Sequence, residues 1–164
     1  MSKASLPVVA LTLGDPSGIG AELIARLLAR PQATEQANLV LVGDPWLWEQ
    51  GQRIAGLQVA TVPLTGLSAA RERADTRLPA FVAVDTIAQA DVVQGQVGAA
   101  GGRSVLQVLD QCMDAALAGD IDAICFAPLN KQAMKLGGLR HEDELHHFAE
   151  YLGVTGYFCE FNTL

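Results

Sequence analysis

The stretch PVVALTLGDPSGIGAE, residues 7–22, decides the fold of this chain. Residues 7–13 form a continuous apolar run with the length of a buried strand, and the rest predicts a tight turn followed by an amphipathic helix. Gly14, Gly18 and Gly20 allow backbone angles and close approaches that other residues resist. Such a turn directs helix N–H groups toward the space above the sheet edge, so these glycines are candidates for binding a cofactor. Neither common nucleotide signature is matched, and a tight turn without a ligand is the alternative.

The composition predicts one globular domain that binds neither nucleic acid nor membrane. The chain has 164 residues, of which 50% are hydrophobic, and a formal net charge of −7. This length supports a real core, while the acidic balance offers no basic stripe for nucleic acid. Because no apolar run has transmembrane length and the N-terminus lacks a signal-peptide layout, we expect a cytoplasmic protein. Cys112, Cys125 and Cys159 are widely spaced in apolar surroundings and predict reduced core thiols.

Alternating strands and helices predict an α/β fold, with a mostly parallel sheet and helices on both faces. Strands are expected at residues 7–13, 38–42, 57–63, 80–84, 122–127 and 157–161. Helices are expected near residues 18–30, 99–118 and 142–152, and shorter ones after Pro45 and Pro128. In the first helix, Leu23, Leu27 and Leu28 are predicted to face inward. The strand at 122–127 is predicted to be fully buried and central in the sheet.

Charged residues follow the carboxyl ends of two predicted strands, where open α/β sheets bind ligands. Lys131 follows the apolar strand at 122–127 and has the chemistry to neutralise a phosphate or polarise a carbonyl. A solvated lysine in the first turn of a helix is the alternative. Asp15 ends the first strand and is a candidate for a cleft, whereas Asp44, in a second Gly-Asp-Pro turn, is interpreted as bonding its own turn.

The densest group of titratable side chains is HEDELHH, residues 141–147. Glu142 and His146 are four residues apart, and Glu144 and His147 three apart, so each pair shares a helix face. Contact with a substrate is one interpretation, and a charged helix start that suits the positive N-terminal end is the other. Because no fixed ligand spacing is present, no self-contained metal site is predicted. A glycine-rich stretch at 95–103 allows an anion site, although chain flexibility or close helix packing explains it better.

Four segments resemble, in order and spacing, the 4-hydroxythreonine-4-phosphate dehydrogenase (PdxA) family. Residues 14–22 resemble the family's GDPAGIGPE signature, and residues 127–131, APLNK, resemble its APINK. Residues 95–103 resemble its GxxSxxxGR stretch, and residues 116–124 resemble its ALAGEVDAI. Four motifs in register are far more specific than any one alone, and the resemblance covers essentially the whole chain.

The resemblance implies the isocitrate/isopropylmalate dehydrogenase fold, with two α/β domains and a homodimer. Family members are roughly twice this long, so residues 1–164 are expected to form the N-terminal portion. The implied activity is oxidation of a phosphorylated hydroxy acid with NAD or NADP and a divalent metal cation whose ligands lie in the second half. Under this interpretation the catalytic candidates are Lys131 and Asp15, the substrate-binding candidates are His141, Asp143, Glu144 and Asn130, and the cofactor-binding candidates are Gly14, Gly18 and Gly20.

One departure from the family bears on the substrate. The family usually has Gly-His-Thr-Glu before a helix ending in LAELTG, and its His-Thr pair contacts substrate. Aligning residues 148–153 with that ending places Glu144 and Leu145 at the His-Thr pair. This favours a threonate or erythronate phosphate over the vitamin B6 precursor, and a dihydrodiol dehydrogenase-like relative is a third option. Residues 1–164 alone are expected to be inactive, and a non-catalytic α/β module is the alternative from another functional class.

Overall fold

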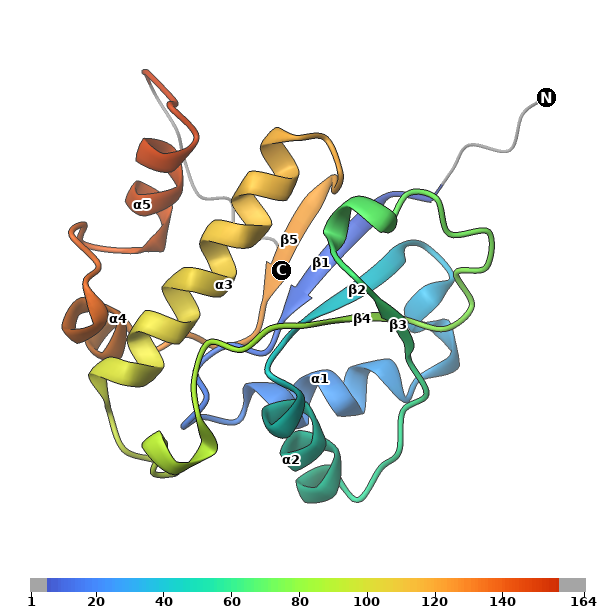
Figure 1. Ribbon diagram of the computed structural model, residues 1–164, viewed down its shortest axis with the longest axis horizontal. Coiled ribbons are helices and arrows are strands. Elements are labelled where there is room, and N and C mark those ends of the chain that lie inside the picture. Colours follow the sequence, from blue (N-terminus) through green and yellow to red (C-terminus); the bar gives the residue numbers. More distant parts are fainter. Residues whose placement is uncertain (1–5, 157–164) are drawn as a thin grey trace, which may run out of the picture.

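The computed structural model describes residues 6–156 and shows a parallel sheet of five strands with helices on both faces (Figure 1). The strands are β1 (Val8–Thr12), β2 (Asn38–Gly43), β3 (Val62–Leu64), β4 (Ala80–Ala83) and β5 (Ala123–Phe126). Their order is β3-β4-β2-β1-β5, and every pairing is parallel. The predicted α/β fold is therefore confirmed, while the strand expected at 157–161 lies outside the described residues.

The helices divide between the two faces according to the alternation of side chains along the strands. They are α1 (Gly20–Leu28), α2 (Pro45–Ala55), α3 (Ala99–Leu117), α4 (Lys131–Gly137) and α5 (Glu144–Tyr151), with 3-10 turns at Pro31–Thr34, Leu67–Ala69 and Gln89–Asp91. Leu11 and Leu41 pack in one core cluster with α1 and α2. Ala10 and Val40 point to the opposite face and pack in a second cluster with α3.

Helix α1 is shorter than predicted, and its inner face is different. The buried residues are Gly20, Ala21, Ile24, Ala25 and Leu28. Of the three leucines predicted to face inward, Leu28 does so, but Leu23 and Leu27 are 42% and 39% exposed. The helical period explains the error, because positions 21, 24, 25 and 28 form one face and positions 23 and 27 lie around the helix from it.

Strand β5 is not the fully buried central strand that the sequence predicts. Within residues 6–156 it pairs only with β1, so it forms an edge of the sheet. Ala123, Cys125 and Phe126 are exposed there. Cys125 is consequently not the predicted core thiol, whereas Cys112 is buried and loss of hydration raises its pKa to about 12. Cys159 lies outside the described residues.

The opposite edge of the sheet is also shorter than predicted. Of the strand expected at residues 57–63, only β3 forms, and it begins at Val62. Pro63 lies within it and has no N–H to donate, which confines such a residue to an edge strand. Between β3 and β4 the chain forms a loop that contains the 3-10 turn Leu67–Ala69.

Close packing between α3 and α4 explains the glycine-rich start of α3. A Cβ on Gly102 would lie 1.8 Å from the carbonyl oxygen of Ala133, and one on Gly137 would lie 2.4 Å from the backbone nitrogen of Arg103. The helix-packing interpretation is therefore confirmed at Gly102, whereas a Cβ on Gly95 or Gly98 would meet nothing within 4 Å. None of the helices within residues 6–156 is both long enough and apolar enough to cross a membrane.

Candidate functional site

The glycine turn after β1 and the segment after β5 meet at the carboxyl edge of the sheet. The backbone nitrogen of Asp15 donates a hydrogen bond of 3.1 Å to the carbonyl oxygen of Pro128. We call this junction, residues 14–20 with residues 127–128, the glycine corner. From it, α1 turns to one face of the sheet, while α4 packs against α3, which covers the other face. Ligands of open α/β sheets bind at such a change of direction.

Packing within the protein accounts for glycine at two of the three predicted cofactor-binding positions. Gly14 has a φ of +73°, and a Cβ there would lie 2.6 Å from the carbonyl oxygen of Pro128. A Cβ on Gly20 would lie 2.1 Å from the carbonyl oxygen of Leu13. Gly18 is exposed, and a Cβ there would meet the carbonyl oxygen of Asp15 at 3.3 Å. Both close approaches at Gly14 and Gly20 are to protein backbone, so cofactor binding by these glycines stays a prediction.

Asp15 orders the same corner. Its side chain is buried, and Oδ1 accepts hydrogen bonds of 2.9 Å from both the backbone nitrogen and the hydroxyl of Ser17. This is the local turn bonding typical of aspartate. The structure thus gives Asp15 a role in shaping the turn, and its catalytic role stays a prediction.

Asn130 and Lys131 form the start of α4, next to the glycine corner. Asn130 is the N-cap, and its Oδ1 accepts a hydrogen bond of 2.9 Å from the backbone nitrogen of Ala133. The Lys131 side chain is 59% exposed, and its ammonium lies 3.8 Å from Oε2 of Glu144 on α5. Lys131 and Glu144, two separately predicted site residues, are therefore neighbours. The amide oxygen of Asn130 already accepts a hydrogen bond from the helix backbone.

The Glu144 carboxylate is shielded but incompletely satisfied. Within residues 6–156 its Oε2 is buried and has no hydrogen-bond donor, and 3.8 Å to Lys131 is an ion-pair distance beyond hydrogen-bond range. Asp143 caps α5, because its Oδ1 accepts 3.0 Å and 2.6 Å bonds from the backbone nitrogen and ring Nδ1 of His146. These bonds, and the nearby charges of His146 and Lys131, lower the pKa of Asp143. We call Lys131, Asp143 and Glu144 the acid–lysine cluster.

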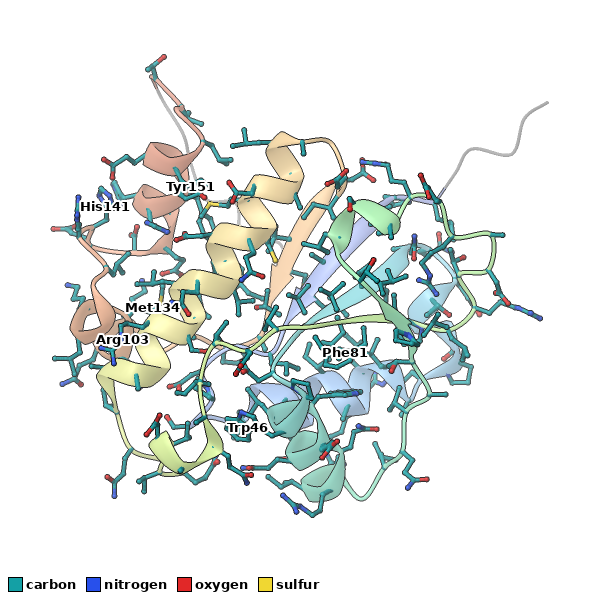
Figure 2. The ribbon with its side chains drawn as sticks, in the orientation of Figure 1. Trp46, Phe81, Arg103, Met134, His141 and Tyr151 are labelled. Atoms are coloured by element: carbon teal, nitrogen blue, oxygen red, sulfur yellow. The ribbon has the colours of Figure 1, made fainter. Side chains whose placement is uncertain are left out.

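His141, the remaining predicted substrate contact, lies in a different group of side chains, where α5 docks on α3. Figure 2 shows His141 and Tyr151 at this end of the molecule. His141 is in contact with Glu150, and His147 Nε2 lies 2.9 Å from Oδ1 of Asp110 rather than facing Glu144. In the described part of the chain, no three His, Cys, Asp or Glu side chains come together to hold a metal ion.

Asp44 is a site residue that sequence reasoning misjudged. It is 2% exposed, and it does not bond its own turn. Instead its carboxylate accepts bonds of 2.9 Å and 2.6 Å from the nitrogen and hydroxyl of Thr86, and a 3.3 Å bond from the nitrogen of Ile87. The prediction for Asp44 is wrong because these partners follow β4, which only the sheet places next to β2. The only feature of the sequence that could have drawn attention to Asp44 is the Gly-Asp-Pro tripeptide, which it shares with the turn at Asp15.

Comparison with known proteins agrees with the resemblance seen in the sequence. The family described as "Pyridoxal phosphate biosynthetic protein PdxA" matches residues 35–163. The chain belongs to the PdxA family. The matched range includes the segments at 95–103, 116–124 and 127–131 that carry the resemblance, so three of its four motifs lie inside the match.

Individual PdxA relatives match nearly all of this chain and about half of themselves. A Pasteurella multocida (strain Pm70) protein provisionally named 4-hydroxythreonine-4-phosphate dehydrogenase is 41% identical over 95% of this chain and 46% of its own length. An Oceanobacillus iheyensis protein provisionally named D-threonate 4-phosphate dehydrogenase is 30% identical over 88% of this chain and 43% of its own. The crystal structure of a 4-hydroxythreonine-4-phosphate dehydrogenase from Burkholderia phymatum matches with a TM-score of 0.82 and 30% identity, over 93% of this chain and 45% of that one. This chain therefore spans about half the length of these relatives.

Proposed function

We propose that residues 1–164 are the N-terminal portion of a dehydrogenase that oxidises a phosphorylated hydroxy acid, and that they supply one side of its active site. Membership of the PdxA family and the names of its relatives support this reaction class. In such a reaction a CH–OH group becomes a carbonyl, and NAD or NADP takes the hydride while the hydroxyl proton leaves to a base. The proposal also includes a divalent cation and a homodimer, as the family resemblance implies.

The ion pair between Lys131 and Glu144 is the observation on which the assignment of substrate contacts depends. Lys131 Nζ lies 3.8 Å from Glu144 Oε2, and the lysine side chain is 59% exposed at the carboxyl edge of the sheet. An exposed ammonium there binds a phosphate or carboxylate. The Glu144 side chain is 24% exposed, so its carboxylate is open to a hydrogen bond from a substrate hydroxyl.

This pair supports a sugar-acid phosphate over the amino-bearing vitamin B6 precursor. An isolated acid beside the substrate would repel a phosphate or carboxylate, but the neighbouring lysine offsets that charge. Glu144 then remains to accept a hydrogen bond from an additional hydroxyl, which threonate and erythronate phosphates present. We assign threonate or erythronate phosphate as the substrate class. The D-threonate name of the Oceanobacillus relative is in keeping with this choice.

Steady-state kinetics on the gene product at its natural full length test the proposal. We expect greater kcat/KM for threonate or erythronate 4-phosphate than for 4-hydroxythreonine 4-phosphate, with NADH or NADPH formation followed by absorbance. Residues 1–164 alone should show no turnover. If the full-length protein oxidises none of these compounds, the dehydrogenase proposal fails and a non-catalytic module is favoured.

Two variants test the roles within the pair. Glu144→Gln should reduce kcat/KM for the hydroxyl-bearing substrate at least tenfold, since a bond to a charged acceptor contributes about 1.5–3 kcal/mol. Glu142→Gln is the matched control, because Glu142 is exposed two residues away. Lys131→Met should raise KM for the anionic substrate, with Lys135→Met as its control in the same helix. Equal effects of variant and control would contradict the assigned roles.

A further inference from the structure

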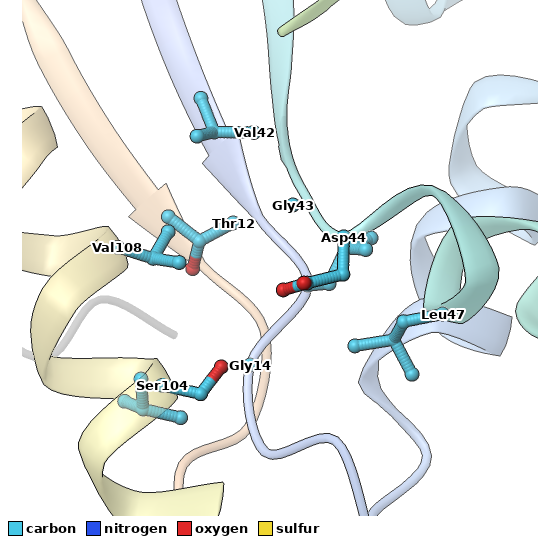
Figure 3. A pocket seen from close by; sticks show the side chains of 10 residues that line it. Thr12, Gly14, Val42, Gly43, Asp44, Leu47, Ser104 and Val108 are labelled. Atoms are coloured by element: carbon cyan, nitrogen blue, oxygen red, sulfur yellow. The ribbon is translucent and has the colours of Figure 1, made fainter. Parts of the chain in front are cut away.

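A small cavity lies between the carboxyl ends of β1 and β2 and the first half of α3, beside the glycine corner, and its mostly apolar lining includes three polar side chains (Figure 3). Thr12 and Asp44, which line it, are each 2% exposed, and Ser104 is 4% exposed. Figure 3 shows the side-chain oxygens of these three residues pointing into the same space. Within residues 6–156 the Thr12 hydroxyl has no hydrogen-bond partner. A buried hydroxyl in this position is costly unless something in the cavity bonds to it.

The hydrogen bonds around the cavity fix which of its oxygens still have protons to give. The Thr86 hydroxyl donates its single proton to Asp44 Oδ2 at 2.6 Å. The 2.6 Å contact between the hydroxyls of Thr86 and Ser104 must therefore use the Ser104 proton. Ser104 and Asp44 consequently offer only lone pairs to the cavity. Thr12 is the one lining hydroxyl whose proton is not already used by a partner in the described residues.

The missing partner must accept from one oxygen and donate to two others. We propose that one ordered water molecule occupies this cavity, accepts the Thr12 proton, and donates its own two protons to Asp44 and Ser104. The cavity has about 10 Å³ of room for the centre of a water-sized sphere, which is about what a single water requires. Three polar contacts are also the usual number for a buried water.

The surroundings favour water over a bound cation. The Asp44 carboxylate already accepts from Thr86 and Ile87, and it lies at the N-terminal end of α2, where the helix dipole favours negative charge. Its charge therefore needs no further counter-ion. In this arrangement the water bonds Thr12 at the end of β1 to Asp44 and Ser104, which are already connected to each other through the hydroxyl of Thr86. Thr12 is thus a positioning residue for the strand end that leads into Gly14.

The direction in which Thr12→Val changes Tm distinguishes a cavity that holds the water from a dry one. Valine has the shape of threonine without its hydroxyl. If the water is present, Thr12→Val removes one of its three bonds, and we expect the Tm of the protein to fall by about 2–4 °C. If the cavity is dry, the same change removes an unsatisfied buried hydroxyl, so Tm should stay constant or rise. Thr12→Ser keeps the hydroxyl and is the matched control for the loss of the proton donor.

A crystal structure at a resolution that shows ordered waters provides the second, independent measurement. We expect one electron-density peak within hydrogen-bond distance of Thr12, Asp44 and Ser104, with no anomalous signal in rubidium-soaked crystals. The proposal fails if the cavity has no peak, or if Thr12→Val leaves Tm unchanged or raises it. It also fails if Tm depends specifically on sodium, potassium or ammonium at constant ionic strength, which would identify a cation. Should Thr12→Val not fold, the crystal structure and Thr12→Ser still decide the matter.

Discussion

The glycine corner and the acid–lysine cluster lie at the same edge of the sheet, but different forces hold them. In the corner, backbone meets backbone, and positions 14 and 20 have no space for a Cβ. In the cluster, Lys131 and Glu144 meet through side chains that are 59% and 24% exposed and 3.8 Å apart. Exposed ion pairs contribute little to stability. The comparison indicates that residues of the corner determine the stability of the fold. Residues of the cluster, in contrast, can be substituted without unfolding the domain.

Crowding the corner should produce the largest loss of stability. Gly20→Ala places a Cβ 2.1 Å from the carbonyl oxygen of Leu13, so β1 and α1 must separate. We expect the free energy of unfolding to fall by about 3 kcal/mol, measured by chemical denaturation. Gly98→Ala is the control, because a Cβ there meets nothing within 4 Å and its φ of −140° suits alanine. Equal losses in both variants would show that packing does not define the corner.

Removing the buried carboxylate beside the corner should have the next largest effect. Asp44→Ala leaves the two backbone N–H groups and the hydroxyl that it binds without their acceptor. The expected loss is about 2 kcal/mol of unfolding free energy. Asp85→Ala, at an exposed position next to Thr86 in the loop after β4, should change stability by less than about 0.5 kcal/mol. A similar loss in both would mean that surface charge, rather than the buried bonds, is responsible.

Breaking the cluster should leave the fold intact. The Lys131–Glu144 pair is partly exposed, so a double-mutant cycle of Lys131→Met and Glu144→Gln should give a coupling of about 0.5 kcal/mol or less. The same variants are expected to alter kinetics strongly. A coupling above about 2 kcal/mol would make the pair a structural element and remove the contrast with the corner.

The smallest expected effect is a pH-dependent loosening of α5. The pKa of Asp143 is lowered by its bonds to His146, so the cap is stabilising above the ordinary carboxyl range and is lost as pH falls toward the lowered value. Hydrogen-exchange protection of the His146 amide, corrected for intrinsic rates, should fall in acid before that of α3. Asp143→Asn retains a capping oxygen without a titrating carboxylate. In this variant the protection of the His146 amide should no longer fall in acid. A fall equal to that of the unmodified protein would contradict the assignment.

Several features of the site were predictable because they depend on residues close in sequence. The apolar run at 7–13 and the glycines after it predicted β1, the turn and α1, and the spacing of Val105 and Leu109 predicted α3. Asn130 and Asp143 were predicted to bind substrate, and the structure shows that they are the N-caps of α4 and α5. Local bonding determines these elements, so a local pattern suffices to find them.

Tertiary structure decided everything that depends on which strands are neighbours. The sequence of an apolar strand such as residues 123–126 is the same at the centre and at the edge of a sheet, and the order β3-β4-β2-β1-β5 places it at the edge within residues 6–156. That order also brings Asp44 to Thr86, and Asp15 to Pro128. The packing of α5 then brings Glu144 to Lys131. The sequence by itself determined most of the elements and the family resemblance, and it nominated the candidate residues. Partners distant along the chain were decided by packing, because burial selects faces and neighbours that no local pattern records.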